Sequence, residues 1–177
     1  REAMDEYAVS SQARAIAAID SGFLAKQIVP IEVPDGRGTR TFAVDESPRR
    51  GLDMARLAKL RPAFKEGGKV TAGNSSGVTD GAAAMLVGDR ASLEAQGVQP
   101  EARIVAWAVG GVPPRILGHG PVPAIHQLLE RTNLQISDVD YFEINEAFAV
   151  VNLHVERQLG IPRDAHNLYG GGISVGH

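Results

Sequence analysis

The sequence predicts an α/β protein, on the basis of its length, its composition and the order of its segments. The 177 residues are 44% apolar and 22% charged, which is the composition of an ordinary globular domain and excludes a disordered or collagen-like chain. From residue 99 onward, strand-like and helix-like segments alternate, an order typical of a parallel sheet covered by helices. Length alone favours a single domain, because the chain is short for two independent hydrophobic cores.

The first 68 residues predict a helix, an edge hairpin and a second, short helix. Small and apolar side chains recur at helical spacing over residues 5–20. Residues 27–33 are rich in β-forming side chains, and the turn residues after them favour a hairpin with residues 39–44. Residues 52–60 then predict a helix that a proline ends.

Residues 69–98 predict a short strand, a loop and a buried apolar segment. A strand at the start of residues 70–77 leads into a loop of small polar residues. Residues 81–88 are wholly apolar, which indicates burial. The alanines in this run favour a helix and its short length favours a strand, and we expect a strand over residues 82–87. A short helix over residues 90–96 follows.

Residues 99–177 contain the alternation that defines the fold class. Two strands, two helices and the start of a third strand are expected in the order β, α, β, α, β, at residues 102–109, 121–132, 139–144, 146–159 and 167–169. A glycine-rich turn closes the chain.

Basic residues are concentrated in residues 49–69 of an otherwise acidic chain. The net charge is −3, yet this segment carries seven lysines and arginines against two acidic residues. Such a local patch fits a small polyanionic ligand better than a nucleic-acid duplex, and a solvated basic surface is the alternative. The apolar runs are far shorter than the roughly 20 residues that span a bilayer. We therefore expect neither nucleic acid nor membrane as a partner.

The chain has no cysteine, which excludes disulfides, thiolate metal sites and cysteine nucleophiles within it and fits a cytoplasmic setting. The histidines other than His177 show no metal-ligand spacing, so no metal site is expected.

Three features could carry chemistry. Asn145 lies where a strand is expected to end and a helix to begin, and a helix cap is the alternative to a functional role. A cap would not require the adjacent Glu146. His177 follows three glycines, 170–172, and could act as a general base or as an N–H donor to an oxyanion. Residues 73–77 could form a backbone cradle with hydroxyl donors.

Four segments carry a family resemblance. They are VTAGNSSGVTDGAA at 70–83, GHGPVPA at 118–124, NEAF at 145–148 and GGGISVGH at 170–177. In this order and spacing they are similar to the thiolase family, and the resemblance extends over the whole chain. It implies acyl-CoA chemistry, either condensation of two acetyl-CoA units or cleavage of a 3-ketoacyl-CoA by CoA. It also implies CoA and acyl-CoA as substrates, no permanently bound cofactor, and a homodimer or homotetramer.

The resemblance also implies roles for single residues. His177 matches the histidine that activates the nucleophilic cysteine and binds the thioester oxygen, and Asn145 matches the asparagine that positions a water beside it. Arg49 and its basic neighbours would face the phosphates of CoA, and Ser76 would contact the pantetheine arm. Four further residues match the lining of the pantetheine tunnel or acyl pocket: Phe64, Leu117, Ala147 and Phe148.

The fold implied by the resemblance is a thiolase-like one, in which βαβαβ domains pack central helices between sheets and an inserted α+β loop domain covers CoA. Here it would be incomplete. Residues 1–68 would be part of the loop domain, 69–98 the end of the N-terminal domain and 99–177 the first half of the C-terminal domain. A strand at 82–87 would lack its sheet neighbours, so we expect the isolated chain to be poorly stable.

The chain departs from the family in two ways. Family members are about twice as long and use two cysteines, whereas this chain starts without Met and has no cysteine, so we expect an internal segment that is inactive alone. Leu117 replaces a common methionine, which leaves acyl-chain length open. Ser75 and Ser76 lie in a ligand-contact loop and would need an adjacent base to act as nucleophiles. The alternatives are a non-catalytic CoA-binding or structural thiolase-like protein and, less favoured, a ketoacyl synthase.

Overall fold

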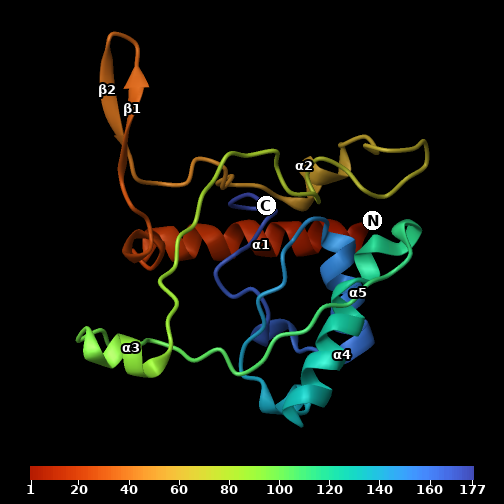
Figure 1. Cartoon of the computed structure of the whole chain (residues 1–177). Helices are drawn as coiled ribbons and strands as arrows, with labels where there is room; N and C mark the ends of the chain where they lie inside the picture. The colour runs from red at the N-terminus through yellow and green to blue at the C-terminus, as the bar shows by residue number, and fades with distance from the viewer.

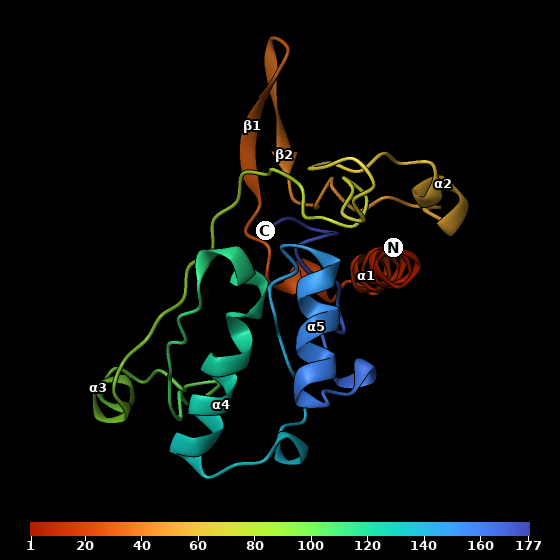
Figure 2. The same ribbon diagram turned by 90° about the vertical axis from the view of Figure 1, so that its right-hand side faces the viewer.

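The computed structural model describes residues 1–177, and a long N-terminal helix organises it (Figure 1). Helix α1 (Glu2–Asp20) crosses the molecule. The segment that contains α2 (Met54–Ala58) lies on one side of it, and the C-terminal half with α4 (Pro121–Thr132) and α5 (Ala149–Leu159) lies on the other (Figures 1 and 2). The site described below lies where these parts meet α1.

Helix α1 forms because its small and apolar residues share one face. Met4, Tyr7, Ala8, Ala15 and Ala18 are buried, and their spacings of three, four and seven residues place them on one helical face. After the helix ends, Gly22 has a φ of +73°, a left-handed conformation that glycine adopts without strain. The helix predicted over residues 5–20 is confirmed and begins three residues earlier.

The predicted hairpin is present, with its first strand beginning at Ile31 and not at residue 27, and it projects from the body of the molecule (Figure 1). Strands β1 (Ile31–Asp35) and β2 (Gly38–Phe42) are antiparallel, with Ile31 opposite Phe42. Gly36 has a φ of +59° in the two-residue turn between them.

Two short helices lie where they were expected, and each is capped by an aspartate. The Asp53 carboxylate accepts from the Arg56 N–H at the start of α2, at 2.7 Å. Asp89 accepts from the Ser92 N–H, at 3.0 Å, at the start of α3 (Arg90–Ala95).

Helices α4 and α5 pack side by side around the second of two hydrophobic clusters (Figure 2). Its buried members are Val122, Phe142, Ile144, Val151, Val155 and Ile161. Helix α5 begins at Ala149 and not at the predicted residue 146, because Phe148 is extended and forms a β-bridge with Ser75. Four 3₁₀ turns complete the elements: η1 (Leu24–Lys26), η2 (Pro114–His119), η3 (Ile136–Asp138) and η4 (Arg163–Ala165).

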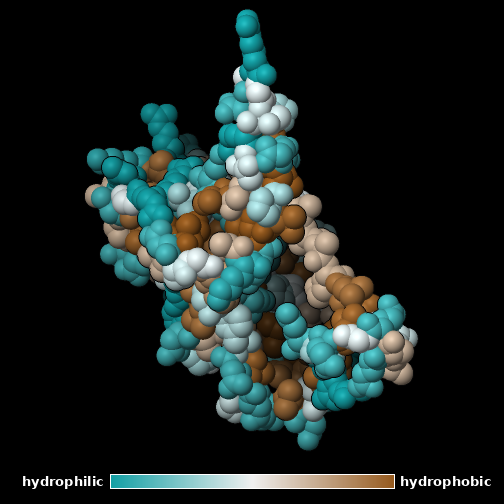
Figure 3. Space-filling model, turned by 90° about the vertical axis from the view of Figure 1, so that its left-hand side faces the viewer, coloured by the Kyte–Doolittle hydropathy of each residue, from teal (hydrophilic) through white to brown (hydrophobic).

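The strands predicted at 82–87 and 102–109 do not form, and the predicted burial of the first is wrong. Met85 is 84% exposed and Trp107 is 70% exposed, and the only sheet is the β1–β2 hairpin. Figure 3 shows apolar surface along the segment that leads to α3. An apolar run becomes a strand only where a neighbouring strand completes its hydrogen bonds, and neither of these two segments pairs with another strand.

The other predicted strands are reduced to single bridges. Residues 139–144 form one parallel bridge, between Phe142 and His166, and the expected third strand forms no ladder. Near residue 70, the strand is reduced to a bridge between Pro62 and Thr71.

None of the helices is both long enough and apolar enough to cross a membrane.

Candidate functional site

Asn145 and His177 are 32 residues apart in the sequence and meet in the structure. The Asn145 Nδ2 atom lies 3.1 Å from the His177 Nε2 atom, and both side chains are exposed. An amide nitrogen only donates, so Nε2 is assigned as the acceptor and the ring proton to Nδ1. The two residues expected to handle the thioester oxygen therefore lie at one solvent-accessible point.

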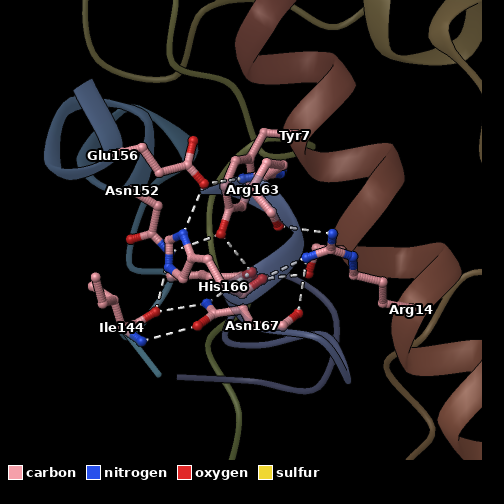
Figure 4. Close-up of polar contacts among 10 residues, drawn as sticks. Tyr7, Arg14, Ile144, Asn152, Glu156, Arg163, His166 and Asn167 are labelled. Atoms are coloured by element: carbon pink, nitrogen blue, oxygen red, sulfur yellow. Dashed lines mark hydrogen bonds and ion pairs between the residues drawn. The ribbon is translucent and has the colours of Figure 1, made fainter. Parts of the chain in front are cut away.

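The backbone before Asn145 is held by the buried side chain of Asn167. The Asn167 Oδ1 atom accepts from the Ile144 N–H at 2.9 Å, and Asn167 Nδ2 donates to the Ile144 carbonyl at 2.7 Å (Figure 4). Asn152 Nδ2 also donates to this carbonyl, at 3.0 Å. An amide side chain thus makes both hydrogen bonds that a neighbouring strand would make.

The residue after Asn145 is a buried carboxylate. Glu146 is 1% exposed and accepts hydrogen bonds from the hydroxyls of Tyr7 and Ser11 on α1, at 2.9 Å and 2.6 Å. It also accepts from the Ile173 N–H at 3.1 Å, in the turn that carries His177. Glu146 therefore contacts both α1 and the glycine-rich turn.

The glycines of this turn are needed because of close approach. A Cβ atom on Gly171 would lie 2.6 Å from Glu146 Cδ, and one on Gly172 would lie 2.9 Å from Asn145 Oδ1. With contacts this short, a side chain at either position requires a shift of the turn or of Glu146 and Asn145.

The loop at 73–77 is fastened to the residues that precede α5. The Ser76 N–H donates to the Ala147 carbonyl at 3.1 Å, and the Ala149 N–H donates to the Asn74 carbonyl at 3.0 Å. Phe64 packs edge-on against Phe148, with 5.8 Å between ring centroids. The structure thus brings Ser76, expected to contact the pantetheine arm, together with three residues expected to line the pantetheine tunnel or the acyl pocket: Phe64, Ala147 and Phe148.

A cavity of about 520 Å³ lies between α1, α2 and this loop. Arg49 and Arg56 line it, together with Ser75 and Thr79. Arg50 instead pairs with Asp20, at 2.5 Å, and this salt bridge holds the pKa of Asp20 below its ordinary value. Only part of the basic segment therefore faces the cavity.

Gln12, on α1, joins this cavity to the turn. Its Oε1 atom accepts from the Arg49 N–H at 2.7 Å, and its Nε2 atom donates to the Ile173 carbonyl at 3.2 Å. Gln12 was not predicted from the sequence, because nothing local in α1 indicates a partner more than thirty residues away.

Leu117 lies apart from these residues. It is 65% exposed on η2 and does not line the cavity that Arg49 faces. Its turn is attached to α5 by the pair His119 Nδ1 and His154 Nε2, 2.8 Å apart. Leu117 therefore shares no pocket with Arg49 within this chain.

The candidate nucleophiles do not meet a base. Ser75 Oγ donates to the Thr71 carbonyl at 2.7 Å, so its proton is already engaged by the backbone. Histidine, aspartate and glutamate side chains gather in no group of three or more that could hold a metal ion.

A second polar cluster lies at the segment that precedes Asn167 (Figure 4). The Glu156 carboxylate binds His166 Nδ1 and Arg163 Nη1, each at 2.7 Å. Burial alone would raise the pKa of Glu156, but these two hydrogen bonds outweigh it and hold the pKa below its ordinary value. Arg163 also stacks 3.6 Å from the ring of Tyr7, whose pKa is raised by burial and by the charge of Glu146.

Comparison with known proteins agrees with the motifs at this site. The thiolase N-terminal domain family matches residues 1–91, and the thiolase C-terminal domain family matches residues 98–177. The acetyl-CoA acetyltransferase of Escherichia coli is 45% identical to the chain over 177 residues.

Two solved structures have the same arrangement. An acetyl-CoA acetyltransferase of Bacillus anthracis superimposes with a TM-score of 0.97 at 44% identity, and human mitochondrial 3-ketoacyl-CoA thiolase with a TM-score of 0.92 at 42% identity. All of the chain is covered in each comparison, and it spans 45% of the length of each of these three relatives. The fold is the thiolase-like α/β fold, as a partial segment, and the chain belongs to the thiolase family.

Proposed function

We propose that the intact protein transfers acyl groups between CoA thioesters through an acyl-cysteine whose cysteine lies outside these residues. The reaction is either condensation of two acetyl-CoA units or cleavage of a 3-ketoacyl-CoA by CoA, since both directions use the same groups. The contact between Asn145 Nδ2 and His177 Nε2, at 3.1 Å, carries the proposal. The names of the relatives, an acetyltransferase and a ketoacyl thiolase, support both directions.

In this proposal, His177 has two roles. As a base it takes the proton of the cysteine thiol, which creates the thiolate that attacks the thioester. With its Nε2 protonated, the ring then donates to the thioester oxygen as negative charge develops there. Once Nε2 carries this proton it no longer accepts from Asn145, and the Asn145 Nδ2 group is then free to position a water that donates to that oxygen. Donors fixed in this way bind the charged oxygen of the transition state more strongly than the thioester oxygen of the substrate. They therefore accelerate the reaction and do not merely tighten substrate binding.

The CoA molecule is assigned to the surface next to this point. Arg49 and Arg56 face the cavity between α1 and α2 and supply positive charge for phosphates. The pantetheine arm would pass the loop at 73–77 and the Phe64–Phe148 pair, with Ser76 and Ala147 beside it. Leu117 is assigned to the acyl pocket by resemblance alone. CoA is a substrate here, and no permanently bound cofactor is proposed.

Further parts of the proposal concern the protein as a whole. We assign it to the cytoplasm and to a homodimer or homotetramer, and the division of the chain at residues 68 and 98 stays a prediction. The chain alone has no cysteine and is proposed to be inactive.

The test is thiolysis of a 3-ketoacyl-CoA by the intact protein, with and without Asn145→Ala. We expect kcat to fall about 100-fold or more, as for loss of one oxyanion donor, while the affinity for CoA changes little. Gln158→Ala, on the exposed side of α5, is the control and should leave kcat unchanged. Unchanged turnover in Asn145→Ala would exclude its assigned role. Binding of CoA without any turnover by the wild-type protein would favour a non-catalytic CoA-binding protein.

A further inference from the structure

A capping role does not explain why the carboxylate of Glu146 is buried. It follows the residue assigned to the oxyanion site, is 1% exposed and forms no salt bridge. A buried carboxylate without an ion-pair partner is unfavourable unless several donors surround it. A site built for packing alone would not need one.

Four donors surround this carboxylate and use all of its acceptor positions. Oε1 accepts from the Tyr7 hydroxyl at 2.9 Å and from Asn167 Nδ2 at 3.2 Å. Oε2 accepts from the Ser11 hydroxyl at 2.6 Å and from the Ile173 N–H at 3.1 Å. Two oxygens offer about four lone-pair positions, so every position has a partner.

The partners come from three separate parts of the chain. Tyr7 and Ser11 lie on α1, Asn167 holds the backbone of Ile144, and Ile173 belongs to the turn that ends at His177. Gly171 lets the turn approach the carboxylate, because a Cβ atom there would lie 2.6 Å from Glu146 Cδ. Glu146 is therefore in direct contact with the turn of His177 while it is covalently bonded to Asn145.

We propose that Glu146 is a positioning residue whose buried carboxylate fixes the turn of His177 relative to Asn145 and so sets the contact between the two. The inference rests on the proposed function for its effect on turnover. It does not require Glu146 to touch substrate. The hydrogen bonds to α1 hold the carboxylate in place, and the bond from the Ile173 N–H transmits that position to the turn.

Glu146→Gln in the intact protein tests this at constant size. A glutamine would place its NH₂ group against one of two groups that only donate, the Ile173 N–H or the Asn167 amide. The Tyr7 and Ser11 hydroxyls can reorient, but those two nitrogens cannot. We expect kcat for thiolysis to fall about 10- to 100-fold, the scale of a small misplacement of reacting groups, with KM for CoA nearly unchanged.

Tyr7→Phe is the matched control. It removes a hydrogen bond to the same carboxylate, on the oxygen that does not face Ile173. A purely structural role for Glu146 predicts that both variants lose stability and turnover in proportion. Positioning predicts that only Glu146→Gln loses kcat beyond its loss of stability. Equal effects on kcat in the two variants would overturn the proposal.

Two further measurements separate this proposal from the proposed function. In a cycle with Asn145→Ala, the losses in kcat should combine to less than their product, because both act on one contact, and a full product would argue for independent roles. Amide hydrogen exchange over residues 170–177 should rise in Glu146→Gln and not in Tyr7→Phe, whatever reaction the protein performs. Unchanged exchange in Glu146→Gln would overturn the inference even if Asn145→Ala abolished turnover.

Discussion

Buried asparagine side chains form hydrogen bonds with backbone groups that a neighbouring strand would otherwise bind. Asn167 binds both backbone groups of Ile144, and Asn74 accepts from the Thr71 N–H at 2.9 Å while it donates to Asp5 at 2.8 Å. Both asparagines are nearly inaccessible to solvent. Since an amide offers a donor and an acceptor in one plane, it can shape a loop where no sheet passes.

Arg49 allows a test of the CoA assignment by a single residue. We expect Arg49→Ala to weaken CoA binding by about 1 kcal/mol, or about fivefold, as for a partly exposed ion pair. The effect should be larger at low than at high salt because such a contact is screened. Binding of CoA to the intact protein by calorimetry at two salt concentrations measures it, with Arg61→Ala as the control outside the cavity. An equal loss at both concentrations would contradict a screened phosphate contact.

At the scale of elements, α5 is held to the segment after it by Glu156. The carboxylate receives hydrogen bonds from His166 and from Arg163 of η4, so helix and turn are fastened at one point. The Arg14 side chain on α1 donates to the Arg163 carbonyl at 3.0 Å and joins a third element (Figure 4). This cluster lies directly before Asn167 and so supports the backbone near the site.

Glu156→Gln should change how the stability of the intact protein depends on pH. The pKa of Glu156 is lower in the folded state than its ordinary value, so its contribution is present above about pH 4.3, the pKa of a free glutamate, and is lost as pH falls through the folded value. We expect the variant to be less stable at pH 7, by about 1 kcal/mol, and the difference to shrink toward pH 3. Urea unfolding at several pH values measures this, with exposed Glu130→Gln as control. A difference that stays constant with pH would contradict the linkage.

The elements also differ in how far the sequence could predict them. Helices α1, α4 and α5 follow from periodicity and end signals within each segment, so their positions were predictable to within a few residues. Strands depend on pairing with other strands elsewhere in the chain, and residues 82–87 and 102–109 pair with none. The proximity of Asn145 to His177 was expected only through the family motifs. Two of the four donors to Glu146 lie on α1, and the local pattern of that helix shows only its buried face.

For the whole molecule, exposed apolar side chains follow one another closely along two segments. Met85, Leu86 and Val87 are at least 64% exposed, and Ile104, Val105 and Trp107 are at least 67% exposed. Contiguous apolar surface of this kind favours association with other chains or with a covering segment. The hydrophobic clusters lie instead around α1 and between α4 and α5.

We expect the isolated 177-residue chain to unfold without a sharp transition and to bind a hydrophobic dye. Both follow from the exposed apolar segments, which leave few contacts to make unfolding cooperative. Circular dichroism during urea titration and dye fluorescence measure them, with the intact protein as the comparison. Reversible, cooperative unfolding of the isolated chain would contradict this and would show that its two hydrophobic clusters are enough for a stable fold.

The bonds between Glu146 and α1 have a consequence for exchange of segments among relatives. Tyr7 and Ser11 precede the carboxylate by 139 and 135 residues, and the two matched domain families meet between residues 91 and 98. A chimaera joined at that boundary takes the carboxylate from one parent and its hydroxyl donors from the other. Such recombinants keep the buried acceptor satisfied only when the first parent also carries hydroxyls at positions 7 and 11, so these two positions constrain which parents can be combined.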